Sequence, residues 1–283
     1  MDIHVVAIIG AGTMGTGIGQ VVAQAGPRVH LIEADEAAIG RSRQRLEKSL
    51  QGGIERGKLS PQEAQRVRER LTWETSYDAV AECDLVIEAV FEDRDVKRAV
   101  WAGVDRRAPE AALLASNTST LPIAELAGYS GRPERFLGLH FFNPPPAMKL
   151  VEVIPHAGTL PDVRDAAVAF CQRLGKTPLL APDIPGFIVN RALGALVAAA
   201  LEVWDQGGKP EAIDEALELG LGHKMGPLRT CDLVGLDIIL TMLDLLVEQT
   251  GDPRFRATER LRQLVAEGKL GVKTGEGIYH YGE

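Results

Sequence analysis

Short apolar runs alternate with helix-like segments from the N-terminus to about residue 181. Continuous apolar runs of this kind are typical of parallel strands buried on both faces. Strands that alternate with helices predict an α/β domain with a doubly wound, mostly parallel sheet. The expected strands are Val5–Ile9, Val29–Ile32, Leu85–Ala89, Leu113–Ala115, Phe136–Phe142, Leu150–Ile154 and Pro178–Leu180.

The pattern changes after these strands, where prolines and a glycine punctuate the chain and strand-like runs almost disappear. We therefore place a domain boundary near Asp183, between residues 1–183 and an all-helical domain of residues 184–283. The apolar length of the second domain exceeds what one small bundle needs, so we expect it to pair with another copy of the chain. Its expected helices are Phe187–Gln206, Glu211–Leu219, Leu228–Gln249 and Ala257–Glu267.

Composition excludes several classes of protein. The chain has 283 residues, of which 45% are hydrophobic and 25% charged, values ordinary for a folded globular protein. No signal peptide is recognisable, and the apolar stretch 192–201 is too short to span a bilayer, so no membrane association is expected. Three scattered cysteines fit a reducing cytoplasm and no metal-ligand spacing. A net charge of −8 argues against nucleic-acid binding.

Positive charge is nevertheless concentrated in one segment, Arg41–Arg70. It holds nine Lys or Arg residues against four Glu, a local charge of +5 in an otherwise acidic protein. The segment reads as two helices joined by a turn, with Ser60, Pro61 and Glu63 starting the second helix. It is either a solvated helical hairpin or a binding site for a polyanionic ligand.

The first expected strand leads directly into a glycine-rich turn, Gly10-Ala-Gly12-Thr13-Met14-Gly15, and a helix-like stretch. This order is typical of a Rossmann dinucleotide site, in which the helix N-terminus faces the pyrophosphate. Glu33 ends the second strand, where a carboxylate can accept both ribose hydroxyls of NAD and would repel the 2′-phosphate of NADP. The alternative for the glycine segment is a tight turn that binds no ligand. The alternative for Glu33 is an ordinary residue at the end of a strand.

Candidate proton-transfer residues follow later strands. His140 lies in one apolar run and Glu152 in the next, so an imidazole and a carboxylate can meet at the end of the sheet. Ser116-Asn-Thr-Ser-Thr120 follows a strand at the edge where open α/β sheets bind ligands. Asn190 begins the helical domain and could reach back across an interdomain cleft. Each also has a structural explanation, such as a helix cap for the hydroxyls.

Together these segments resemble the 3-hydroxyacyl-CoA dehydrogenase family, and most closely its short bacterial 3-hydroxybutyryl-CoA dehydrogenases, from end to end and in order. The motifs that carry the resemblance are Gly-Ala-Gly-Thr-Met-Gly, Ala115-Ser-Asn-Thr-Ser119, Gly138-Leu-His-Phe-Phe-Asn-Pro, Met148-Lys-Leu-Val-Glu152, Pro185-Gly-Phe-Ile-Val-Asn-Arg191, Met225-Gly-Pro-Leu, Asp232-Leu-Val-Gly-Leu-Asp237 and Gly271-Val-Lys-Thr-Gly-Glu-Gly-Ile-Tyr279.

The resemblance implies a reversible, NAD-dependent oxidation of (S)-3-hydroxyacyl-CoA, with His140 as general acid and base paired with Glu152. Ser119 and Asn190 match the residues that hold the substrate. Contacts on the nicotinamide side would fall on Glu92, Lys97, Asn117 and Lys273, besides the glycine turn and Glu33. CoA contacts would fall on Ser49 and Arg56, within the basic segment.

Small departures from the family pattern concern Pro145, Ala147 and Arg229, and they leave the preferred acyl chain length open. Two other functions are also considered. A related dehydrogenase of another hydroxyl compound, such as a sugar acid, would have little use for the basic segment. A non-catalytic NAD-binding structural protein would bind NADH without turnover of any acyl-CoA.

Overall fold

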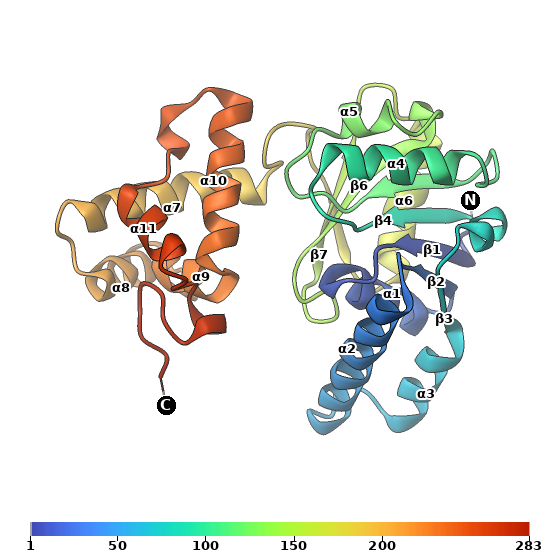
Figure 1. The fold of residues 1–283 in the computed structure, drawn as a ribbon, viewed down its shortest axis with the longest axis horizontal. Helices are drawn as coiled ribbons and strands as arrows, with labels where there is room; N and C mark the ends of the chain where they lie inside the picture. The colour runs from blue at the N-terminus through green and yellow to red at the C-terminus, as the bar shows by residue number, and fades with distance from the viewer. Residues whose placement is uncertain (1, 283) are drawn as a thin grey trace. The chain divides into compact units, whose positions relative to one another are not determined.

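The computed structural model describes residues 2–282, which form two compact units (Figure 1). The first unit ends at Asp183 and the second begins at Ile184. The first unit contains an eight-stranded sheet, and the second consists of helices joined by turns. Each unit has its own buried apolar cluster, as expected of two domains.

The sheet of the first unit has the strand order β3-β2-β1-β4-β5-β6-β7-β8. All neighbouring strands are parallel except β6 and β7, which are antiparallel. This arrangement confirms the predicted doubly wound, mostly parallel fold. The strands are β1 (Val5–Ile9), β2 (Arg28–Ile32), β3 (Leu71–Glu74), β4 (Leu85–Glu88), β5 (Leu113–Ser116), β6 (Phe136–Phe141), β7 (Leu150–Pro155) and β8 (Thr177–Leu180).

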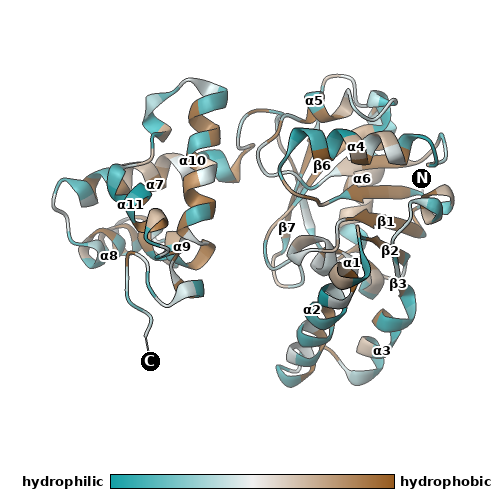
Figure 2. Cartoon of the chain, viewed as in Figure 1, coloured by the Kyte–Doolittle hydropathy of each residue, from teal (hydrophilic) through white to brown (hydrophobic). Residues whose placement is uncertain are grey.

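Helices pack around this sheet, and strands such as β1 and β4 carry its most hydrophobic residues (Figures 1 and 2). Apolar side chains on both faces of a central strand need such cover, which explains the continuous apolar runs in the sequence. The elements are α1 (Thr13–Ala25), α2 (Glu36–Glu55), α3 (Pro61–Arg70), η1 (Asp78–Glu82), α4 (Arg94–Asp105), α5 (Ile123–Ala127), η2 (Pro133–Arg135) and α6 (Pro161–Arg173).

The basic segment forms most of α2 and all of α3, which are largely hydrophilic in Figure 2. The predicted helix start at Ser60 is confirmed as a capping box. The Ser60 hydroxyl accepts from the Glu63 amide at 3.2 Å, and the Glu63 carboxylate accepts from the Ser60 amide at 2.8 Å. The reciprocal bonds satisfy two amide groups that would otherwise lack a partner in the first turn.

The carboxyl ends of four neighbouring strands, β2, β1, β4 and β5, lie in one row, and β6 continues beyond this row to Phe141. In the sheet register, Ile9 of β1 pairs with Ile32 of β2 on one side and Glu88 of β4 on the other. Glu88 then pairs with Ser116 of β5, and Ser116 with Gly138 of β6. The segments after these residues therefore emerge side by side along one edge, where ligands of open α/β sheets bind.

The second unit contains α7 (Val189–Asp205), α8 (Pro210–Leu221), α9 (Pro227–Val234), α10 (Leu236–Thr250), η3 (Pro253–Phe255), α11 (Glu259–Ala266) and η4 (Val272–Thr274). The single helix predicted over Leu228–Gln249 is wrong, because the chain breaks between α9 and α10. Gly235 at the break has φ +109°, a conformation that residues with a Cβ rarely adopt.

Two buried aspartates attach the C-terminal segment to this unit. Asp214 accepts from the backbone amides of Leu228 at 2.8 Å and Arg229 at 2.9 Å, and from the Tyr279 hydroxyl at 2.7 Å. Asp232 accepts from the Tyr279 amide at 2.8 Å. Arg229 also lies over the Tyr279 ring, 4.8 Å from its centroid. This residue, which departs from the family pattern, therefore packs within its own unit.

None of the helices within residues 2–282 combines the length and the apolar character needed to cross a membrane.

Candidate active site

His140 and Glu152 lie within ion-pair distance of each other, buried at the carboxyl end of β6. They are directly opposite each other in the antiparallel β6–β7 pair, so their side chains meet on one face. His140 Nδ1 lies 2.7 Å from Glu152 Oε2, and the two side chains are 7% and 1% exposed. The carboxylate holds the imidazole in one orientation and favours a proton on Nδ1. Proton exchange with a substrate then falls to Nε2.

The loop between these strands is anchored at Pro145, although most of its residues are exposed. Pro145 is buried, and a Cβ placed on Gly17 of α1 would lie 2.8 Å from Pro145 Cδ. Lys176 Nζ donates to the carbonyls of Pro145 and Met148 at 2.6 and 2.7 Å. Pro145 therefore packs against the first helix, whereas Ala147 is exposed.

The segment after β5 lies beside the His140 strand. The side-chain oxygen of Asn117, Oδ1, accepts from the Phe141 backbone amide at 2.9 Å. The backbone amide of Asn117 donates to the Glu88 carbonyl at 2.8 Å. Asn117 thus fixes the end of β5 against the strand that carries His140. Two residues further on, the Ser119 amide donates to Glu92 Oε1 at 2.7 Å.

Lys97 links this segment to the end of β4 through a buried charged network. Its side chain is 1% exposed, and Nζ lies 2.6 Å from Glu88 Oε1 and 3.1 Å from Glu92 Oε2. Glu92 also accepts from the Thr118 hydroxyl at 2.7 Å. Burial alone would raise the pKa of the Glu92 carboxyl, but Lys97 and the hydrogen bonds from Thr118 and Ser119 hold it below its ordinary value. Glu92 is therefore a carboxylate at neutral pH.

Sequence reasoning missed Glu88, which is fully buried at the end of β4. Its carboxylate accepts from the Val90 amide at 2.9 Å and the Ser116 hydroxyl at 2.7 Å, besides pairing with Lys97. A buried charge is tolerated only with such partners. The signal was a single acid inside the otherwise apolar run Leu-Val-Ile-Glu-Ala-Val-Phe.

The glycine turn has the geometry that a dinucleotide requires. Gly10 has φ +90°, and a Cβ there would lie 2.7 Å from the Ala89 carbonyl oxygen. A Cβ on Gly15 would lie 1.8 Å from the Gly10 carbonyl oxygen, so the helix packs closely on the turn. Gly12 faces open space within 4 Å, and no side chain caps α1 there. The first-turn amides, including those of Thr13 and Met14, suit a pyrophosphate.

Glu33 directly follows β2 and reaches this turn. Its Oε1 accepts from the Ala11 amide at 2.6 Å, and its Oε2 from the Ala34 amide at 3.2 Å. The carboxylate thus lies beside the glycine turn, as a ribose-binding acid must. The residues present fit NAD, with a negative charge where NADP would carry its 2′-phosphate.

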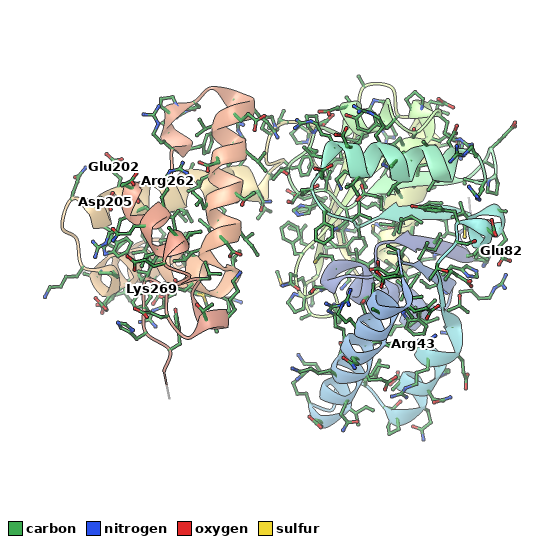
Figure 3. The ribbon with its side chains drawn as sticks, in the orientation of Figure 1. Arg43, Glu82, Glu202, Asp205, Arg262 and Lys269 are labelled. Atoms are coloured by element: carbon green, nitrogen blue, oxygen red, sulfur yellow. The ribbon has the colours of Figure 1, made fainter. Side chains whose placement is uncertain are left out.

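The predicted CoA contacts are both in the hairpin of α2 and α3. Ser49 is half-buried within α2, and the exposed Arg56 caps the end of that helix. Some basic residues here have partners on the protein: Arg68 binds Glu47 at 2.7 Å, and Arg43 (labelled in Figure 3) lies over the Trp73 ring at 5.1 Å. Exposed basic side chains also lie at 41, 45, 48, 56 and 58.

Two predicted residues belong to the second unit. Asn190 lies in the first turn of α7, and Lys273 lies in η4, where Nζ contacts Asp237 at 2.5 and 2.7 Å. The structure thus brings His140, Glu152, Asn117, Ser119, Glu92 and Lys97 to one edge of the sheet. The roles of Asn190 and Lys273 stay predictions.

Comparison with known proteins identifies relatives over the whole chain. A probable 3-hydroxybutyryl-CoA dehydrogenase of Bacillus subtilis is 39% identical over 284 residues, covering 100% of this chain and 99% of the relative. The crystal structure of FadB2 of M. tuberculosis has a TM-score of 0.97, and that of the (S)-3-hydroxybutyryl-CoA dehydrogenase PaaH1 of Ralstonia eutropha 0.94. Both are 38% identical, with full coverage of both chains.

Two family profiles divide the chain between them. The NAD binding domain of 3-hydroxyacyl-CoA dehydrogenase matches residues 5–184, and the C-terminal domain of the same family matches residues 186–281. The matches account for both structural units, and they confirm the resemblance and the NAD-binding fold inferred from the sequence. The chain belongs to the 3-hydroxyacyl-CoA dehydrogenase family.

Proposed function

We propose that the protein catalyses the reversible, NAD-dependent oxidation of a short-chain (S)-3-hydroxyacyl-CoA, such as 3-hydroxybutyryl-CoA, to the 3-oxoacyl-CoA. The observation that carries this proposal is the buried His140–Glu152 pair, with 2.7 Å between Nδ1 and Oε2, on the sheet edge that also carries the glycine turn. The relatives named 3-hydroxybutyryl-CoA dehydrogenase support the substrate.

His140 is the general acid and base of this reaction. In oxidation, its Nε2 takes the proton from the 3-hydroxyl, and the bond between C3 and its hydrogen breaks with both electrons leaving on the hydride. Bound NAD supplies the acceptor for that hydride. Glu152 stabilises the resulting imidazolium through Nδ1, at a site sheltered from water, where such an interaction is stronger than in solution.

Hydrogen-bonding side chains orient the substrate oxygen in this proposal. Ser119 binds the 3-oxygen, and its position is fixed by the bond between its own amide and Glu92. Asn190 is also proposed as a substrate-binding residue, on the family resemblance alone. On the nicotinamide side, Lys97 and Glu92 supply charge, while Asn117 holds the His140 strand in place. Lys273 is proposed as a cofactor-binding residue on the same resemblance.

The hairpin of α2 and α3 would bind CoA. Coenzyme A carries several phosphate charges, and the segment Arg41–Arg70 is the part of the sequence with a strong positive excess. Ser49 and Arg56 are the proposed contacts. The exposure of Arg56 and of neighbouring Lys58 leaves both side chains accessible to phosphates.

The proposal also includes a homodimer formed through the second unit, in the cytoplasm. Three buried free cysteines support a reducing compartment. Apolar side chains that a second copy would cover support dimerisation. They include Val203, Leu219, Leu221, Leu233, Ile238 and Val272.

One assay tests the proposed reaction: NADH absorbance is followed while the purified protein is mixed with 3-oxoacyl-CoAs of increasing chain length. We expect rapid NADH oxidation, fastest with the four-carbon 3-oxoacyl-CoA, and much slower oxidation of NADPH, which is the control. No NADH oxidation with any of these thioesters would contradict the proposal. Turnover of a free hydroxy acid instead would identify a dehydrogenase of another substrate.

A further inference from the structure

Phe91 lies in the turn after β4 and is 85% exposed, more than any other large apolar side chain within residues 2–282. Single apolar residues on a surface are ordinary, so exposure alone indicates nothing. The position of Phe91 is what distinguishes it. It immediately precedes Glu92, on the edge of the sheet that carries the candidate active site.

The backbone on both sides of Phe91 is anchored to the site. On one side, a Cβ placed on Gly10 would lie 2.7 Å from the Ala89 carbonyl and 3.0 Å from Val90 Cγ1, so the glycine turn packs on this segment. On the other side, Glu92 is held by Lys97 and by the Ser119 amide. Phe91 therefore connects the glycine turn with the Ser119 segment.

The turn around Phe91 is itself constrained. The Val90 amide donates to the buried Glu88 carboxylate at 2.9 Å, and the Asp93 amide donates to the Phe91 carbonyl at 2.8 Å. Because this backbone is already fixed, covering the Phe91 ring with a ligand costs only the rotamer freedom of the side chain. This is the condition under which burial of its ring adds most to affinity.

The strand order places Phe91 on the path of the cofactor. The glycine turn follows β1, Phe91 follows β4, Ser119 follows β5, and His140 lies on β6. With about 4.8 Å between neighbouring strands, the turn and His140 are separated by roughly 14 Å along the edge. A dinucleotide whose pyrophosphate lies on the turn must cross the end of β4 to bring its nicotinamide to His140. The adenosine half extends the other way, toward Glu33.

We propose that Phe91 is an apolar platform for the nicotinamide ring of NAD, and that cofactor binding buries the Phe91 side chain. The inference rests on the proposed NAD-dependent function and adds a cofactor-positioning residue to it. Because Phe91 lies on the nicotinamide side of the glycine turn, its ring contributes to the binding of NADH and contributes nothing to the binding of ADP-ribose, which lacks nicotinamide.

The test compares binding of these two ligands to the full-length protein, without acyl-CoA. Titration calorimetry is performed on wild type, Phe91→Ala, Phe91→Tyr and the control Leu160→Ala. Leu160 is 40% exposed and lies beside the amino end of β6, the opposite edge of the sheet, where its amide bonds to the Glu134 carbonyl. It therefore controls for loss of an exposed apolar side chain.

We expect Phe91→Ala to raise the Kd for NADH about tenfold and to leave the Kd for ADP-ribose unchanged. Phe91→Tyr, which keeps the ring, and Leu160→Ala should bind both ligands as wild type does. An unchanged Kd for NADH in Phe91→Ala, or an equal loss for both ligands, would overturn the inference. Failure of wild type to bind NADH would overturn the proposed function and the inference with it. Failure to act on 3-oxoacyl-CoAs, with NADH bound normally, would count only against the proposed substrate.

Discussion

Replacing Glu152 with Gln removes the charge opposite His140 and keeps the size of the side chain. The amide oxygen of Gln can still accept from Nδ1, so the ring keeps its orientation. The substitution removes only the negative charge that Glu152 places beside the protonated ring of His140. Both side chains are buried and the bond is 2.7 Å long, so water cannot replace this interaction. A hydrogen bond to a charged group contributes about 1.5–3 kcal/mol.

If this energy acts only when His140 holds the extra proton, kcat for Glu152→Gln should fall about 10- to 150-fold. The assay is the gain of NADH absorbance with saturating NAD and (S)-3-hydroxyacyl-CoA, the direction in which His140 gains the proton, supplemented by NADH titration and a thermal melt. NADH affinity should stay unchanged, since the pair lies beyond the cofactor turn. Glu134→Gln is the matched control, because Glu134 is an exposed acid in η2, just before β6 begins. A wild-type kcat in Glu152→Gln would refute the reasoning, as would an equal loss of NADH binding.

Three further predictions concern other parts of the site. Replacing Glu33 with Ser should narrow the preference for NADH over NADPH, measured as the ratio of kcat/KM, by about tenfold or more, because the repulsive charge is gone. The double variant Arg56→Ala, Lys58→Ala should raise KM for 3-oxoacyl-CoA several-fold at low salt but leave KM for a thioester of pantetheine, which lacks the nucleotide phosphates, unchanged. Finally, the lowered pKa of Glu92 stabilises the fold above the ordinary value of 4.5, and that stability is lost as pH falls through the lower folded pKa. The difference in thermal midpoint between wild type and Glu92→Gln should therefore shrink below pH 4.5; a constant difference would show that charge is not involved.

Much of the sheet could be predicted because its strands are buried on both faces and are therefore continuously apolar. β3 was missed for the opposite reason. Its sequence Leu-Thr-Trp-Glu lies at the edge of the sheet, and only Leu71 of the four residues is fully buried. Gly235 was missed as a helix break because the apolar pattern of α9 continues into α10, while the backbone turns at a positive φ. Patterns of burial do not report such local backbone conformations.

The pairing of His140 with Glu152 could be predicted because two strands joined by a short loop bring residues from either side of the loop together. The register places His140 opposite Glu152. Because both polar side chains are buried, each needs a hydrogen-bond partner, and each provides one for the other. The pairing of Lys97 with Glu88 was beyond the reach of sequence patterns. It joins a helix to a strand end through a long side chain, and the periodicity of α4 alone does not distinguish a buried Lys from an exposed one.

The central claim is that His140 transfers the substrate proton, and the most direct test is the activity and cofactor binding of His140→Gln. His156→Gln is the control, because His156 lies just after β7, near the amino end of β6. Its ring is hydrogen-bonded to the Pro133 carbonyl oxygen. The account predicts that His140→Gln loses turnover of 3-oxoacyl-CoA by about 100-fold or more, as loss of a general acid does, while its Kd for NADH stays at the wild-type value. Turnover at the wild-type rate in His140→Gln would contradict the account.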